Sequence, residues 1–123
     1  MPTKVLLVED NKENLRLLAV CLELGGIVVE QADSGFEALQ KLEAGTFDVV
    51  VSDIRLPGLS GIDLARRILD NFGAIPTVLM TGDPTIRLTA SIDEAGVSCL
   101  LTKPFRVRDL IKSIQRALPE KTV

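Results

Sequence analysis

The chain has 123 residues, enough for one domain, and its 46% hydrophobic and 25% charged residues exclude a disordered or collagen-like protein. Seventeen acidic residues against 14 basic ones give a net charge of −3, and only 3% of residues are aromatic, so we expect no direct binding of nucleic acid. The chain has no histidine, which excludes a Ser/His/Asp triad, a histidine-ligated zinc site and a phosphohistidine of its own.

The first part of the chain alternates short apolar runs with amphipathic segments. The apolar block Val5–Val8 predicts a strand that is buried on both faces. Apolar residues at helical spacing predict a helix over 11–24, which a glycine pair ends. A β-branched run at 27–29 predicts a second strand, and the pair Ser34 and Glu37 has the spacing of a capping box that begins a second helix.

The rest of the chain repeats the same unit three times. We expect strands over 47–52, 76–80 and 97–101. Helical patterns follow them over 62–72, 84–95 and 107–118. The pattern over 84–95 is the weakest, because several β-branched residues lower its helix propensity.

Five alternating strands and helices define the expected fold. Such alternation predicts right-handed crossovers and a parallel sheet with helices on both faces, and five units are too few to close an eight-stranded barrel. The fold class is therefore α/β, a (βα)5 doubly wound sheet of five parallel strands. In such a sheet, the loops at the carboxyl ends of the strands form the binding crevice.

Polar residues follow four of the five expected strands at this edge: Glu9, Asp10, Asp53, Thr81 and Lys103. Three carboxylates in one crevice repel one another unless a cation joins them, and a set of oxygen ligands without His or Cys fits Mg²⁺. With Mg²⁺ bound, one Asp could attack a phosphoryl group while Lys103 neutralises its oxygens and Thr81 donates a hydrogen bond. The edge therefore predicts a site for an aspartyl phosphate.

The motifs at this edge resemble those of the receiver domain of two-component response regulators, of the kind found in chemotaxis regulators. They are Glu9-Asp10 after KVLLV, Asp53 within VVVSDIRLPGLSG, Thr81-Gly82 after VLM, and Lys103-Pro104-Phe105 after CLLT. Their order and spacing agree with the family over essentially the whole chain. The resemblance implies a flavodoxin-like receiver domain over 1–118, followed by a C-terminal tail or linker stub over 119–123.

The resemblance also implies a role for each acidic residue. Asp53 would accept a phosphoryl group from the phosphohistidine of a histidine kinase or a histidine phosphotransfer protein. Asp10, Asp53 and the backbone carbonyl of Arg55 would ligate Mg²⁺, and Glu9 would act through metal-bound water. A protein of this kind catalyses its own phosphorylation and dephosphorylation, but it is a signalling module rather than an enzyme.

The remaining motif residues would bind the phosphoryl group and change conformation in response to it. The resemblance implies that Thr81 is the switch hydroxyl, that Lys103 pairs with the phosphate and that the Lys103–Pro104 peptide bond is cis. Gly82 leaves the phosphodonor an open approach, although a plain turn glycine is an equally good explanation. Receiver domains usually carry Tyr or Phe three residues before the lysine, where this chain has Leu100, so we expect Thr81 to carry most of the switch.

Two loop charges and three loop residues surround the expected site. Arg55 lies two residues beyond the acceptor and Asp83 two beyond Thr81, and they are either solvated charges or a pair that gates access. Pro57, Gly58 and Gly61 shape the loop after the acceptor, and a glycine with positive φ is their ordinary explanation.

The expected output is a change at the surface formed by the helix over 84–95, the strand over 97–101 and the helix over 107–118. Its partner is unknown, and a homodimer is possible. Cys21 and Cys99 lie in apolar runs, and we expect them to be buried free thiols in a reducing compartment. The sequence has neither a membrane-spanning run nor the apolar core of a signal peptide, which predicts a cytoplasmic protein without membrane contact.

Alternatives from other classes use the same residues. A phosphatase of the haloacid dehalogenase type needs a D-x-D motif, but this chain has Arg55 in place of the second acid, and no cap domain fits its length. A degenerate receiver that acts as an unphosphorylated interaction module is favoured by Leu100 and opposed by the complete acidic, Thr and Lys set. A dinucleotide-binding glycine motif and a P-loop are both absent.

Overall fold

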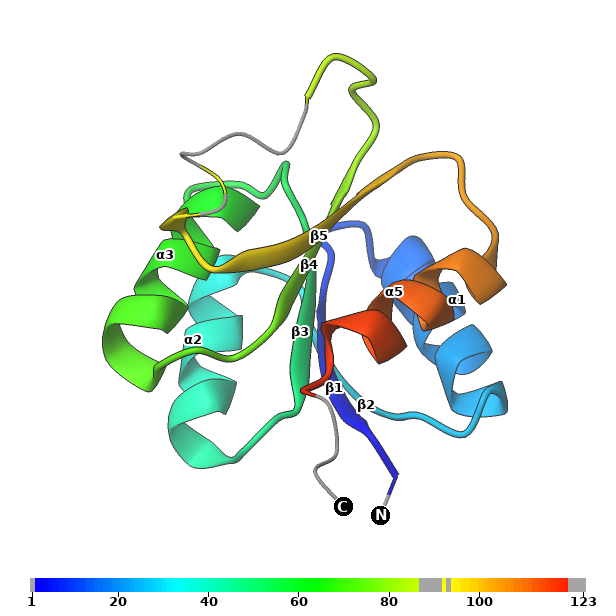
Figure 1. The fold of residues 1–123 in the computed structure, drawn as a ribbon, viewed down its shortest axis with the longest axis horizontal. Coiled ribbons are helices and arrows are strands. Elements are labelled where there is room, and N and C mark those ends of the chain that lie inside the picture. Colours follow the sequence, from blue (N-terminus) through cyan, green and yellow to red (C-terminus); the bar gives the residue numbers. More distant parts are fainter. Residues whose placement is uncertain (1, 87–91, 93, 120–123) are drawn as a thin grey trace.

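A computed structural model of the chain describes residues 2–86, 92 and 94–119. In this part of the chain, five parallel strands form one sheet in the order β2-β1-β3-β4-β5, with helices on both faces (Figure 1). The strands are β1 (Lys4–Val8), β2 (Val28–Ala32), β3 (Val49–Asp53), β4 (Thr77–Thr81) and β5 (Val97–Thr102). The doubly wound α/β fold is confirmed.

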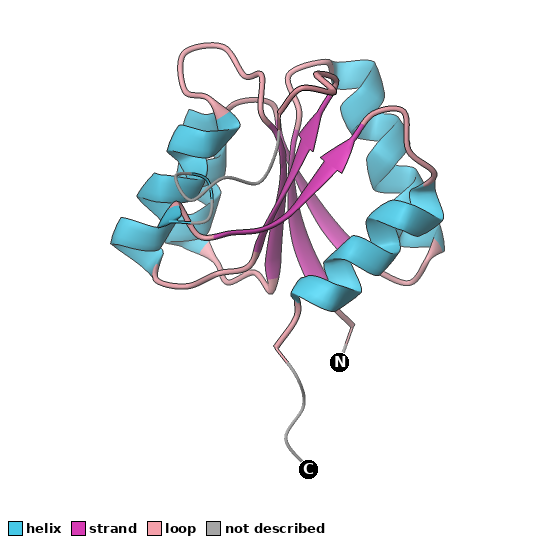
Figure 2. Cartoon of the chain, turned by 45° about the horizontal axis from the view of Figure 1, so that its top comes forward, coloured by secondary structure: helices cyan, strands magenta, loops and turns pink. Residues whose placement is uncertain are grey.

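The helices form two layers, seen on either side of the sheet in Figure 2. One layer consists of α1 (Lys12–Leu24) and α5 (Val107–Ala117), and the other of α2 (Gly35–Ala44) and α3 (Gly61–Phe72). Three of them begin at a side-chain cap, where Asn11, Ser34 and Ser60 each accept a hydrogen bond from a backbone N–H three residues later. Half of the capping box predicted at Ser34 is formed: the Ser34 hydroxyl accepts from the Glu37 N–H at 3.1 Å, but the Glu37 carboxylate accepts from the Asp33 N–H at 2.9 Å, one residue before the cap.

Alternate residues of the central strands fill the two faces of the sheet. Leu7 and Val51 pack with the α1 and α5 layer, whereas Leu6 and Val50 pack with the α2 and α3 layer. All four side chains are fully buried. The chain runs from β1 to β2 on one side and then returns to β3 on the other, so β1 and β3 are neighbours at the topological switch point.

Some expectations on strand bounds and on burial need correction. The second strand runs over Val28–Ala32 rather than 27–29, because an edge strand can include exposed polar residues such as Glu30. Cys21 and Cys99 are free thiols but half-buried rather than buried. Residues 87–91 and 93 of the expected helix over 84–95 lie outside the described residues. Of the residues that are described, Pro84 and Thr85 form a turn, and Ile92 and Glu94 are helical.

None of the described helices is both long and apolar enough to cross a bilayer.

Candidate functional site

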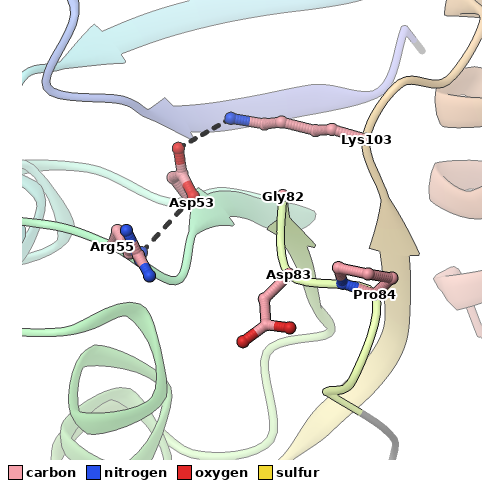
Figure 3. A pocket seen from close by; sticks show the side chains of 6 residues that line it. All are labelled: Asp53, Arg55, Gly82, Asp83, Pro84 and Lys103. Carbon is pink, nitrogen blue, oxygen red and sulfur yellow. Dashed lines mark hydrogen bonds and ion pairs between the residues drawn. The ribbon is translucent and has the colours of Figure 1, made fainter.

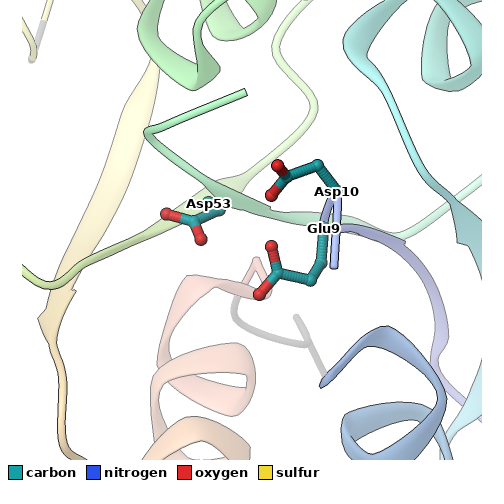
Figure 4. A group of neighbouring side chains, drawn as sticks. All are labelled: Glu9, Asp10 and Asp53. Carbon is teal, nitrogen blue, oxygen red and sulfur yellow. The ribbon is translucent and has the colours of Figure 1, made fainter. Parts of the chain in front are cut away.

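Three carboxylates meet at the carboxyl ends of β1 and β3 (Figure 4). Glu9 and Asp10 directly follow β1, and Asp53 is the last residue of β3. One carboxylate oxygen of each residue lies within 4.8 Å of the other two. Glu9 is 2% and Asp53 8% exposed, whereas Asp10 is open to solvent. The cluster is therefore buried on one side and accessible on the other.

Lys103 brings an ammonium group to this cluster from the end of β5. Its Nζ lies 2.8 Å from Asp53 Oδ2 (Figure 3). The same Nζ lies 3.7 Å from Glu9 Oε1. The Lys103 N–H donates to the Thr81 carbonyl at 2.7 Å, and the Lys103–Pro104 peptide bond is cis. The backbone thus holds the lysine at the edge of the sheet, beside Asp53.

The charges of the site are not balanced. Burial raises the pKa of Glu9, and the nearby charge of Asp53 raises it further. Burial opposes the charge of Lys103, but its hydrogen bond and ion pair with Asp53 outweigh this and raise the pKa of Lys103. Three carboxylates and one ammonium leave an excess of negative charge around oxygen donors alone. Such a donor set fits a hard divalent cation such as Mg²⁺.

Thr81 is the last residue of β4, and Gly82, which follows it, lines a cavity together with Asp53. The Thr81 side chain is buried, and its Oγ1 accepts a hydrogen bond from the Asp83 N–H at 3.0 Å. Gly82 does not have a positive φ, and a Cβ built on it meets no atom within 4 Å. A turn conformation therefore does not require glycine at this position, and a side chain would project into open space.

A cavity of about 450 Å³ opens beside Asp53 (Figure 3). Its lining residues are Asp53, Arg55, Gly82, Asp83, Pro84 and Lys103. The Arg55 N–H donates to Asp53 Oδ1 at 3.3 Å, and the Arg55 side chain is exposed. Asp83 Oδ1 accepts from both the N–H and the hydroxyl of Thr85, at 2.9 and 2.6 Å. The charged residues around the cavity are thus two carboxylates, Asp53 and Asp83, and two cations, Arg55 and Lys103.

Leu100 lies away from this cavity, in the strand β5. It is half-buried and pairs in register with Leu79 of β4. Its neighbours belong to a small apolar cluster that also includes Ile62 and Ile86. The residue is therefore part of the packing behind the site.

Gly61 is a positioning residue that sequence reasoning explained wrongly. Of the loop glycines, Gly58 has φ +80°, but Gly61 does not have a positive φ. A Cβ at Gly61 would lie 2.3 Å from the Asp53 carbonyl oxygen, and the Gly61 N–H donates to the Ile54 carbonyl at 2.8 Å. The start of α3 thus packs directly on the backbone of Asp53 and Ile54. A glycine next to a helix cap is the only sequence signal for this contact.

Comparisons with known proteins agree with this geometry. The family model of the response regulator receiver domain matches residues 5–115. The response regulator receiver protein CpdR of Brucella abortus is 32% identical over 94% of this chain and 96% of its own length. The structure of the chemotaxis response regulator CheY4 of Vibrio cholerae superposes with a TM-score of 0.87 at 28% identity, covering 96% of this chain and all of that one.

Longer proteins are also similar to the chain. The transcriptional regulatory protein DctD of Rhizobium meliloti is 34% identical over 92% of this chain, which spans only 25% of DctD. Fold, site and comparisons together define a signalling module with an acidic crevice at the end of a parallel sheet. The chain belongs to the response regulator receiver domain family.

Proposed function

We propose that this chain is the Mg²⁺-dependent phosphoacceptor of a two-component phosphorelay. Asp53 accepts a phosphoryl group from the phosphohistidine of a histidine kinase or a histidine phosphotransfer protein. The observation that carries this proposal is the position of the Asp53 carboxylate, which lies between two further carboxylates and the Lys103 ammonium and faces an open cavity of about 450 Å³.

Each residue of the acidic crevice has its own role in the proposed transfer of the phosphoryl group. Asp10, Asp53 and the Arg55 carbonyl would hold Mg²⁺, with Glu9 acting through water, and the ion would neutralise charge on the phosphoryl oxygens. The Asp53 carboxylate forms an O–P bond as the P–N bond of the donor breaks, and the released imidazole takes up a proton. Lys103, now 2.8 Å from Asp53, pairs with an oxygen of the transferred group.

The apolar face of α1 is the docking surface that we assign to the donor. Leu17, Val20 and Leu24 are 63%, 51% and 84% exposed, and they follow one another at helical spacing. A second cavity, of about 320 Å³, connects this face to the acidic crevice, because its lining residues are Glu9, Asn14, Leu17, Leu18, Lys103, Pro104 and Phe105. A donor that reaches Asp53 beside Lys103 therefore covers exposed apolar area on α1, which favours binding.

Thr81 couples the phosphoryl group to the output surface in this proposal. Its hydroxyl turns toward the phosphate, so the hydrogen bond from the Asp83 N–H changes, and with it the turn that Asp83 makes with Thr85. The output surface, to which β5 and α5 belong, then shifts between two states. Arg55 and Asp83 line the cavity and gate the approach of donors and water to Asp53.

Labelling by a small phosphodonor tests the proposal. The chain is incubated with phosphoramidate in Mg²⁺, and its intact mass is compared with that of Asp53→Asn and with that of a sample in a chelator. We expect one phosphoryl group on the parent and none on the other two. A folded parent that is never labelled would instead indicate an unphosphorylated interaction module. Sustained hydrolysis of phosphate monoesters would indicate a phosphatase.

A further inference from the structure

The helix α5 carries a concentration of positive charge in an otherwise acidic chain. With its N-cap, it has four basic residues, Arg106, Arg108, Lys112 and Arg116, and a single acid, Asp109. This stretch therefore has a net charge of +3, so the remainder of the chain has −6. The charge is not spread evenly over the molecule.

Three of these cations follow one another on successive turns of the helix, in a row that we call the α5 basic stripe: Arg108, Lys112 and Arg116. All three are exposed, and the opposite face of the helix buries Leu110 and Ile114 in the core. Successive cations are four residues apart, so they lie about 6 Å from one another along the axis, and the stripe is roughly 12 Å long. It faces solvent along nearly the whole helix.

Carboxylates of the described residues do not neutralise the stripe. Both salt bridges in the part of the chain that the structure describes belong to Lys103. The Asp109 carboxylate accepts a hydrogen bond from the Arg106 N–H at 3.2 Å and thus caps the start of the helix. The stripe is consequently available to an external anion.

Helix stability does not explain the arrangement. Like charges four residues apart repel each other, and a cation in the first turn of a helix, as at Arg108, is opposed by the helix dipole. Only Arg116, in the last turn, is favoured by that dipole. A row of residues that lowers the stability of its own helix is best explained by a function.

We infer that the α5 basic stripe binds an acidic segment of a partner protein. Carboxylates on successive turns of a helix, about 6 Å apart, or on alternate residues of an extended segment, about 6.6 Å apart, match the spacing of the cations. A nucleic acid fits less well, because three cations neutralise few phosphates and the −6 charge of the remaining chain repels a long polyanion. The inference deepens the proposed function by naming the chemistry of its output partner.

A labelled peptide provides the test. The probe is an alanine-based helical peptide with Glu at every fourth position, and its control has Gln at the same positions. Binding to the full chain is measured by fluorescence anisotropy at low and at physiological salt. We expect the Glu peptide alone to bind, with an affinity that falls as salt screens the charges.

Paired variants locate the binding site. Lys112→Gln with Arg116→Gln removes two charges of the stripe, and the matched control, Arg66→Gln with Arg67→Gln, removes two exposed charges from α3. The stripe variant should lose roughly five- to tenfold in affinity, the amount expected for two exposed ion pairs, while the control keeps the affinity of the parent. Thermal melts of both variants should show intact folds, because all four side chains are exposed.

Each contrary outcome overturns the inference. Equal losses in the two variants would show a nonspecific charge effect, and tighter binding of an oligothymidylate than of the Glu peptide would show a nucleic-acid surface. Phosphoramidate labelling of the same samples keeps this test separate from that of the proposed function. If labelling fails while the Glu peptide still binds to the stripe, the proposed function is wrong and the docking surface stands.

Discussion

The two ends of the neighbouring strands β1 and β3 differ in how their charges are matched. At the amino end, the Lys4 N–H donates to the Asp48 carboxylate at 2.8 Å, and the Lys4 ammonium lies 4.8 Å from the centre of the Phe47 ring. At the carboxyl end, Asp53 and two more carboxylates share a single ammonium. We call the amino end balanced, because its charged side chains have partners, and the carboxyl end unbalanced, because its excess of negative charge suits the cation and the phosphoryl group of the proposed function.

The largest effect should come from removing a carboxylate at the unbalanced end. Asp10→Ala deletes a proposed direct ligand of Mg²⁺. Because the loss of an outer-shell partner alone typically lowers metal affinity by about 10- to 100-fold, the Mg²⁺ affinity of this variant should fall by at least that much. Isothermal titration measures the affinity. Asp48→Ala removes a carboxylate from the balanced end and should leave it unchanged. Equal Mg²⁺ affinity of Asp10→Ala and the parent would refute the site.

A methyl group behind the acceptor should be nearly as damaging. Gly61→Ala places a Cβ 2.3 Å from the Asp53 carbonyl oxygen, so the strand end must shift. We expect a loss of about 1–3 kcal/mol in the free energy of unfolding and slower phosphoramidate labelling. Gly82→Ala is the matched control, because its Cβ meets no atom within 4 Å and should leave the urea midpoint unchanged. Identical urea midpoints and labelling rates for Gly61→Ala and the parent would contradict the contact.

Two substitutions behind the unbalanced end should differ in kind. Thr81→Ala should largely uncouple phosphorylation from partner binding, because the switch hydroxyl is lost. Leu100→Ala should mainly lower stability, by about 1–2 kcal/mol for a half-buried leucine. Partner affinity with and without phosphate, together with urea unfolding, separates the two. If a Leu100→Ala protein folded normally but no longer responded to phosphate, Leu100 rather than Thr81 would be the switch residue.

The smallest effect concerns the pH dependence of stability. Burial and the charge of Asp53 raise the pKa of Glu9 above its ordinary value of 4.5, so the folded protein holds this proton more tightly than the unfolded chain. Stability therefore falls as the pH rises from 4.5 through the raised pKa, and the penalty is fully present above that pKa. Glu9→Gln removes this penalty and should raise the urea midpoint at neutral pH, with a smaller gain in acid.

The balanced end supplies the opposite control for Glu9→Gln. Asp48→Ala should lower the free energy of unfolding by up to about 1 kcal/mol, because the Lys4 N–H loses its acceptor. Mg²⁺ should stabilise the parent and so reduce its difference from Glu9→Gln. If neutralising Glu9 lowered stability in the absence of Mg²⁺, the carboxyl end would be balanced after all.

Much of the site could be predicted because its residues mark the ends of strands. Asp53 ends an apolar run that only a buried strand explains, and the rule for parallel sheets then places it beside Asp10. The role of Gly61 could not be predicted, because the contact between the start of α3 and the acceptor backbone exists only in the tertiary structure. The exposure of Leu17 and Leu24 could not be predicted either. A helical pattern of apolar residues predicts a helix, but it does not tell which of these residues stay exposed to solvent.

The middle position of β3 has a consequence for how long a signal can last. All five residues of β3 are buried, and the strand is paired on both sides. Amide groups in such a strand exchange with solvent only when the whole domain opens, whereas loops at the sheet edge open far more often. The acyl phosphate of the proposed function would thus be attached to a strand that opens only together with the whole domain. Its decay would then depend on the loops that admit water, and not on the rate at which the domain unfolds.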